Sequence, residues 1–162
     1  EYGLNFEKGE WIHWEERLPN PYKPSEGTKF HRILVPTVDT VRNSYILSGL
    51  VHQRFHTLCV GHTGTGKTSC VASSILQNLD DQVYAMLTIN FSAQTNSLKT
   101  QNIIEGKLEK RIKNKFGPPG NRKLVCFCDD LNMPRKDTFG SQPPLELLRQ
   151  WMDYGCWYDR SK

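Results

Sequence analysis

The stretch that decides the fold is "GHTGTGKT", which runs from Gly61 to Thr68. It matches the pattern G-x-x-x-x-G-K-[ST] in full, in which a glycine-rich loop between a strand and a helix holds phosphates. Glycines allow backbone N–H groups to close on an anion, and the following helix points its positive end at the same place. The sequence therefore predicts a nucleotide-binding loop rather than a glycine-rich turn with an incidental lysine.

The loop is expected to supply side chains as well as backbone groups. Lys67 would neutralise the β- and γ-phosphates, and the hydroxyl of Thr68 would ligate Mg²⁺. His62 lies at a variable position of the pattern, where we expect a solvated side chain. The predicted phosphate-binding residues are Gly61, His62, Thr63, Gly64, Thr65, Gly66, Lys67 and Thr68.

A second candidate site is "LVCFCDD", Leu124 to Asp130, where an apolar run ends in two carboxylates. Unpaired charge beside a core is costly, so a cation or a reaction should account for the acids. In a phosphate-loop protein, an acid at the end of a neighbouring buried strand holds Mg²⁺, and Asp129 is the candidate. Asp130 is the candidate for activating water, although its side chain reaches about 1.5 Å less far than that of a glutamate. The alternative for Asp130 is an ordinary acid at a strand end.

The chain around these motifs alternates strand-like and helical segments. Strands are expected over residues 56–60, 82–92 and 123–128, and helices over residues 37–53, 66–79, 98–115 and 143–155, with a turn over 116–121. This alternation predicts an α/β fold with a mostly parallel sheet. In the last helix, we expect Leu145, Leu148 and Met152 to pack in the core rather than against a partner.

The composition is that of a globular protein. The 162 residues are 37% hydrophobic and 23% charged, with a formal net charge of +4. Such a mild charge does not call for nucleic acid or a membrane surface, and we expect neither as a partner. The five cysteines are odd in number, and we expect buried reduced thiols, including Cys126 and Cys128 on one face of a strand.

The two ends of the chain have their own predictions. Residues 1–29 are polar and broken by prolines, so we expect an irregular linker there, followed by a nucleotide-binding domain over 30–162. The apolar residues Trp11, Ile12 and Trp14 would pack on something outside the chain. The chain begins without an initiator methionine, and we expect a fragment of a longer protein.

Both phosphate-binding signatures, together with "ILVPTVDTVR", "LTINFSAQT", "FGPPGNRK", "DDLNMP" and "GSQPPLELLRQWMDYGCWYDR", resemble one family. Residues 33–162 look like the third AAA+ module of an axonemal dynein heavy chain. The strings outside the two signatures carry this resemblance, because they separate dynein from other AAA+ proteins. The resemblance implies a P-loop NTPase fold with a three-layer αβα core.

The resemblance also implies roles for particular residues. Val35, Pro36, Thr37 and Val38 would lie against the adenine of ATP or ADP. Asn90 resembles the polar residue that holds the catalytic acid or senses the γ-phosphate. Asp130 departs from the Asp-Glu pair of active AAA+ ATPases, so binding of Mg-ATP with slow or no hydrolysis is expected.

The resemblance implies a larger assembly around this piece. The sensor strand, which lies between the phosphate-loop strand and the 123–128 strand, would follow residue 162, as would the small helical domain. The partners would be neighbouring AAA+ modules, with dynein intermediate and light chains and microtubules bound through the parent chain. The location would be the cytoplasm and cytoskeleton, in the axoneme of a cilium or flagellum.

Two other classes of function remain alternatives. A self-sufficient P-loop NTPase, such as a small kinase, should carry an arginine-rich lid, and "KLEKRIKNK" is the only basic cluster. A nucleic-acid-dependent AAA+ ATPase would use that cluster as a phosphate stripe on the predicted 98–115 helix. A solvated helix face, with Glu109 and Lys113 spaced for an i,i+4 pair, is the preferred interpretation.

Overall fold

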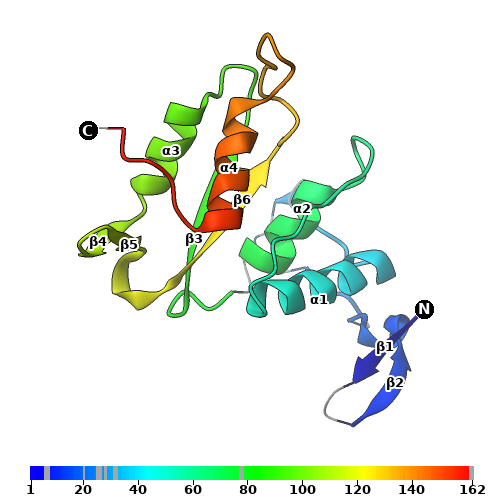
Figure 1. Cartoon of the computed structure of the whole chain (residues 1–162). Helices are drawn as coiled ribbons and strands as arrows, with labels where there is room; N and C mark the ends of the chain where they lie inside the picture. The colour runs from blue at the N-terminus through cyan, green and yellow to red at the C-terminus, as the bar shows by residue number, and fades with distance from the viewer. Residues whose placement is uncertain are drawn as a thin grey trace. The chain divides into compact units, whose positions relative to one another are not determined.

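The computed structural model describes residues 1–5, 8–19, 21–24, 27, 29–30, 33–76 and 79–160. The backbone divides into two compact units, Glu1–Asn78 and Leu79–Lys162, whose elements are drawn in Figure 1. Within these described ranges, no helix has the length and hydropathy needed to cross a membrane.

The first unit opens with an antiparallel hairpin of β1 (Tyr2–Asn5) and β2 (Glu10–His13), followed by the 3₁₀ turn η1 (Trp14–Arg17). The predicted irregular backbone is therefore wrong for this part of residues 1–29. The prediction that Trp14 packs outside the chain is also wrong. Trp14 is only 5% exposed, whereas Trp11 is 70% exposed and its role stays a prediction.

Trp14 is buried because an aromatic and cationic stack holds it against the helix α1 (Val38–His52). The rings of Trp14 and Tyr45 meet edge to face at 5.4 Å. The Arg17 guanidinium lies 5.0 Å from the Trp14 ring and 4.6 Å from the Tyr45 ring, and its Nη2 donates to the Leu4 carbonyl at 3.0 Å. Gly3 is required here, because a Cβ would lie 2.7 Å from the Trp14 ring.

The helices of the first unit agree with the sequence. α1 begins after a capping box between Thr37 and Thr40, which satisfies the first N–H groups of the helix. α2 (Lys67–Val71) follows the glycine-rich loop and continues as the π-helical turn η3 (Ala72–Leu76). The predictions over 37–53 and 66–79 are confirmed as far as the described residues reach.

The predicted strand 56–60 is wrong. These residues have no regular structure, and Leu58 and Val60 are 70% and 83% exposed. An extended segment becomes a strand only where a neighbour completes its backbone hydrogen bonds. No strand within the described part of the chain pairs with this segment.

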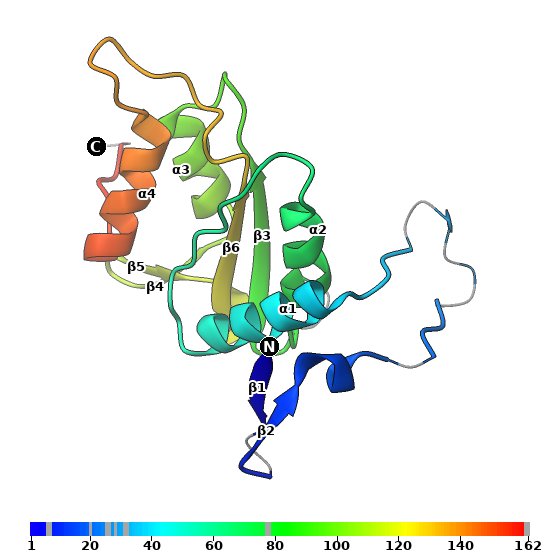
Figure 2. The same cartoon turned by 90° about the vertical axis from the view of Figure 1, so that its right-hand side faces the viewer.

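The second unit is built on two parallel strands, β3 (Tyr84–Asn90) and β6 (Lys123–Asp129). The helices α3 (Ser97–Glu105) and α4 (Pro143–Tyr154) cover one face of this sheet, as Figure 2 shows. The predicted strands over 82–92 and 123–128 and the predicted helix over 143–155 are therefore confirmed. The unit is an α/β arrangement with a parallel sheet.

The core of the second unit lies between this sheet and its helices. Leu87, Ile89 and Phe91 alternate along β3 and its end, so they point to one face and pack against Ile104 of α3. The surrounding, partly buried residues include Cys126, Cys128, Leu148, Trp151 and Trp157. Core packing is thus confirmed for Leu148, but Met152 is 51% exposed and Leu147 is buried instead.

The predicted helix over 98–115 is wrong beyond its first half. α3 ends at Glu105, and a hairpin of β4 (Glu109–Ile112) and β5 (Lys115–Gly117) follows, before the 3₁₀ turn η4 (Pro119–Asn121). Every residue from 109 to 116 is exposed, so a helix there would bury no apolar face and gain no stability from packing. The predicted i,i+4 pair of Glu109 and Lys113 disappears with the helix.

Ile104→Ala should destabilise the second unit by about 2–5 kcal/mol, because the removed atoms leave a cavity at a side chain that is 0% exposed. Hydrogen exchange of β3 and β6 peptides in the full-length parent chain should accelerate accordingly. Ile112→Ala makes the same change at a position that is 70% exposed. Equal acceleration in the two variants would contradict the assigned core.

Candidate nucleotide site

The glycine-rich loop has the backbone that its sequence predicts. Gly64 and Gly66 have φ angles of 82° and 75°, in the left-handed region that other residues adopt at a cost. Gly66 is the N-cap of α2, so the loop turns directly into the helix. A Cβ at Gly61 would lie 3.3 Å from Thr65 Oγ1 and 3.5 Å from Lys67 Cδ, so the loop is closely packed on itself there.

Lys67 folds back over this loop. Its Nζ donates to the carbonyl oxygens of Gly61 and His62 at 2.8 and 2.6 Å. Thr65 Oγ1 donates to the same His62 carbonyl at 2.8 Å. The exposed His62 therefore contributes its backbone to the loop, in agreement with the predicted solvated side chain. The Lys67 ammonium thus lies against the backbone carbonyls of its own loop.

The strand ends of the second unit bring the predicted polar residues together. Asn90 and Asp129 are register partners in β3 and β6, and register partners on parallel strands point to the same face. Directly after Asn90, Phe91 N donates a hydrogen bond of 3.0 Å to the Asp129 carbonyl, which links the ends of the two strands. Both residues therefore lie at the carboxyl edge of the sheet, where ligands of α/β proteins bind.

Asp130 departs from the strand geometry. Its φ is 54°, in the left-handed region, and its N–H donates to Asp129 Oδ1 at 3.1 Å. Met133 N then donates to the Asp130 carbonyl at 3.0 Å, which closes a turn. Aspartate tolerates this backbone better than most residues. A turn thus begins at Asp130, directly after the strand.

The predicted adenine segment precedes α1 and is open to solvent. Val35 is 61% exposed, and the Leu34 carbonyl accepts a hydrogen bond of 3.0 Å from the Tyr22 hydroxyl. Thr37 is the N-cap of α1, so its side chain is used within the helix start. The segment offers exposed apolar surface of the kind that an adenine ring covers, and its role stays a prediction.

Two thiols lie behind the strand end. Cys126 and Cys128 are free, and their Sγ atoms are 3.8 Å apart. The hydrogen bond between the two thiols, together with burial, raises the pKa of Cys126, and the same hydrogen bond lowers the pKa of Cys128. The prediction that these two thiols lie on one face of a strand is confirmed, but predicted burial is wrong for Cys59 and Cys156, which are exposed, and only partial for this pair.

The predicted site residues therefore form two groups. The phosphate loop and residues 35–38 belong to the first unit, whereas Asn90, Asp129 and Asp130 belong to the second. The oxygen donors of Thr68 and Asp129, a hydroxyl and a carboxylate, are of the type that Mg²⁺ prefers. Among the described residues, no cluster of three or more His, Cys, Asp or Glu side chains offers a separate metal site.

Gly66→Ala should strain the loop by about 1–2 kcal/mol, because alanine must adopt the left-handed backbone at a φ of 75°. Hydrogen exchange of residues 61–71 in the full-length parent chain should become faster. Gly49→Ala is the matched control, because Gly49 lies within α1 and a Cβ there meets nothing within 4 Å. Faster exchange in the control and not in Gly66→Ala would refute the strained-loop geometry.

A glycine-rich loop that opens a helix and a parallel sheet whose strand ends in acids are the features of a P-loop module of the α/β class. A family model described as "P-loop containing dynein motor region" matches residues 22–162. The chain belongs to this family.

Curated relatives agree over the whole chain. It is 52% identical over 162 residues to "Dynein-1-beta heavy chain, flagellar inner arm I1 complex" of Chlamydomonas reinhardtii, and 49% identical over 162 residues to "Dynein axonemal heavy chain 2" of Homo sapiens. It is 48% identical over 150 residues, 92% of the chain, to "Dynein axonemal heavy chain 6" of Homo sapiens. The chain spans only 4% of the length of each of these relatives.

Proposed function

We propose that this chain is the nucleotide-binding part of the third AAA+ module of an axonemal dynein heavy chain. Its site would bind ATP or ADP with Mg²⁺ and regulate the motor ring. The observation that carries the proposal is the loop itself, in which Lys67 Nζ bridges two carbonyls beside glycines held at positive φ.

Each residue has a distinct task in this proposal. Backbone N–H groups of the loop bind the phosphate oxygens, and Lys67 exchanges its carbonyl partners for the β- and γ-phosphates. The Thr68 hydroxyl and the Asp129 carboxylate would hold Mg²⁺, whose bound charge offsets that of the phosphates. Asn90, the register partner of Asp129, would hold the catalytic acid or sense the γ-phosphate.

Hydrolysis at this site is expected to be slow. Asp130 is the only acid next to Asp129 along the chain, and its short side chain starts from a turned backbone. A group misplaced by about 1 Å can lose on the order of a hundredfold in rate. Nucleotide binding in this proposal does not depend on Asp130, so the module would retain its nucleotide and hydrolyse it slowly.

Motor activity and its partners would belong to the full-length heavy chain, of which this chain is a small part. We infer that the parent chain is a microtubule motor that moves toward the minus end. It would be located in the cytoskeleton, in the axoneme of a cilium or flagellum, because the relatives are named as axonemal and flagellar dyneins. Its partners would be the neighbouring AAA+ modules of the same chain, microtubules, and dynein intermediate and light chains.

Photolabelling of the full-length heavy chain with 8-azido-ATP tests the proposal. Because the azide sits on the adenine ring, the label should appear on a peptide that contains residues 35–38, and it should fall when EDTA removes Mg²⁺. Excess unlabelled ATP is the competition control. Labelling of other modules with none on this peptide would refute adenine binding here.

A further inference from the structure

The hairpin of β4 and β5 with its leading residues, 107–117, is here named the basic hairpin. It contains four lysines and Arg111 against one carboxylate, Glu109, so it alone matches the net charge of +4 of the whole chain. The remaining residues are therefore neutral on balance. The net positive charge is thus concentrated on this hairpin, whereas positive and negative side chains balance in the rest of the chain.

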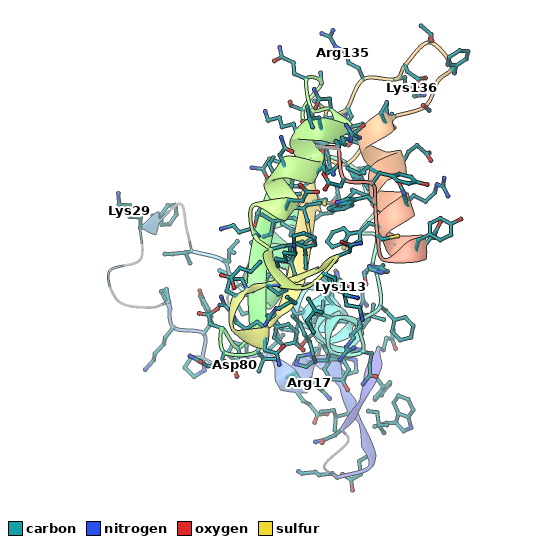
Figure 3. All side chains as sticks on the ribbon, turned by 60° about the vertical axis from the view of Figure 1, so that its left-hand side comes forward. Arg17, Lys29, Asp80, Lys113, Arg135 and Lys136 are labelled. Atoms are coloured by element: carbon teal, nitrogen blue, oxygen red, sulfur yellow. The ribbon has the colours of Figure 1, made fainter. Side chains whose placement is uncertain are left out.

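The four lysines of the basic hairpin differ from its arginine in their contacts with the described residues. Arg111 is engaged, because its Nη2 donates to the Pro118 carbonyl and its guanidinium covers Gly117. By contrast, none of the four lysines forms an ion pair within the described residues. These lysines are Lys107, Lys110, Lys113 and Lys115, all of them exposed. Figure 3 labels Lys113, which lies in the turn between the two strands.

The same hairpin exposes apolar side chains and strand edges. Ile112 and Phe116 are 70% and 60% exposed. The sheet has only two strands among the described residues, so each strand has an outer edge whose backbone groups can pair with a further strand. An exposed edge of this kind with apolar residues is a site to which proteins add a strand of a partner.

We propose that the basic hairpin docks an extended, acidic segment of protein, which adds to it as a third strand. Carboxylates of the segment would face the lysines, and its apolar side chains would cover Ile112 and Phe116. The exposed edges favour a polypeptide over nucleic acid, because only a polypeptide can continue the backbone ladder. The inference goes beyond the nucleotide site and stands even if that site binds nothing.

Zero-length carbodiimide crosslinking of the full-length heavy chain tests this surface, because it joins a lysine to a carboxylate only where the two are in contact. Lys113 serves as the reporter and is left unchanged. We expect Lys113 to be joined to an Asp- or Glu-rich segment outside residues 105–109. The yield should fall about fivefold when Lys110→Gln and Lys115→Gln are combined, since two charge contacts are lost.

The matched control combines Lys99→Gln and Lys136→Gln, which removes the same charge at exposed lysines outside the hairpin. It should leave the Lys113 yield unchanged. Ile112→Ser with Phe116→Ser should lower the yield without changing the charge. Crosslinks confined to Glu105 and Glu109, an equal fall in the control, or ultraviolet crosslinking of the hairpin to RNA in place of a carboxylate would each overturn the proposal.

Discussion

Lys67→Ala in the full-length heavy chain is expected to empty this module of nucleotide. In the proposed complex, Lys67 Nζ leaves the Gly61 and His62 carbonyls, to which it donates at 2.8 and 2.6 Å, and bonds the β- and γ-phosphates instead. Hydrogen bonds to a charged group are each worth about 1.5–3 kcal/mol, so loss of those to the phosphates should lower affinity by about a hundredfold or more. The change also removes the two bonds that order the free loop.

Bound nucleotide per heavy chain, counted by chromatography after rapid gel filtration, measures this effect. The count should fall by about one relative to the unaltered chain, since a P-loop module holds a single nucleotide. Lys136→Ala is the control, because it removes an exposed lysine from a loop of the second unit. An unchanged count in Lys67→Ala would remove the phosphate-loop assignment, because residues 61–68 contain no other lysine or arginine that could replace Lys67.

The features that sequence predicted well are those fixed by local chemistry. The glycine positions of the loop demand a left-handed backbone, and Gly64 and Gly66 have it. The apolar run before Asp129 forms a partly buried strand because its alternate residues pack on one core, with Asn90 in register beside the acid. The glycine pattern specifies its own backbone, whereas the strand forms because β3 completes its hydrogen bonds.

The features that sequence missed depend on neighbours. Residues 98–115 contain many helix-forming residues, but Gly106 weakens the pattern in its middle, and propensity alone does not hold a helix that buries no face. The chain therefore forms a hairpin after Gly106, with five basic side chains in solvent. Residues 56–60 include the apolar Leu58 and Val60 yet pair with no described strand, and Trp14 packs against Tyr45, which is distant in the sequence. Long-range pairing of this kind leaves no local signal.

The turn at Asp130 was also missed, and it changes how the second acid should be tested. An aspartate followed at two residues by Asn132 is a turn composition, which could have signalled a break directly after the strand. Because φ is 54°, the side chain does not continue the alternation of β6. If Asp130 activates water, the proposed limit on hydrolysis would therefore depend on two quantities, the length of its side chain and the direction set by the turned backbone.

Asp130→Glu separates these two quantities. If reach is the limit, the added methylene should raise single-site turnover in the full-length heavy chain, by up to about a hundredfold. If direction is the limit, turnover should stay the same, and the longer side chain should cost about 1–2 kcal/mol in the left-handed backbone. Single-turnover release of phosphate is the measurement, with the hydrolysis acids of the other modules inactivated.

Asp130→Asn completes the test, because asparagine keeps the turn and removes only the charge. Nucleotide binding should be retained in this variant, since Lys67, Thr68 and Asp129 are untouched, and any residual turnover should be lost. Turnover that survives in Asp130→Asn would mean that Asp130 is an ordinary acid at a strand end. Turnover that rises in Asp130→Glu and vanishes in Asp130→Asn would instead assign water activation to this position and attribute its slowness to one missing methylene.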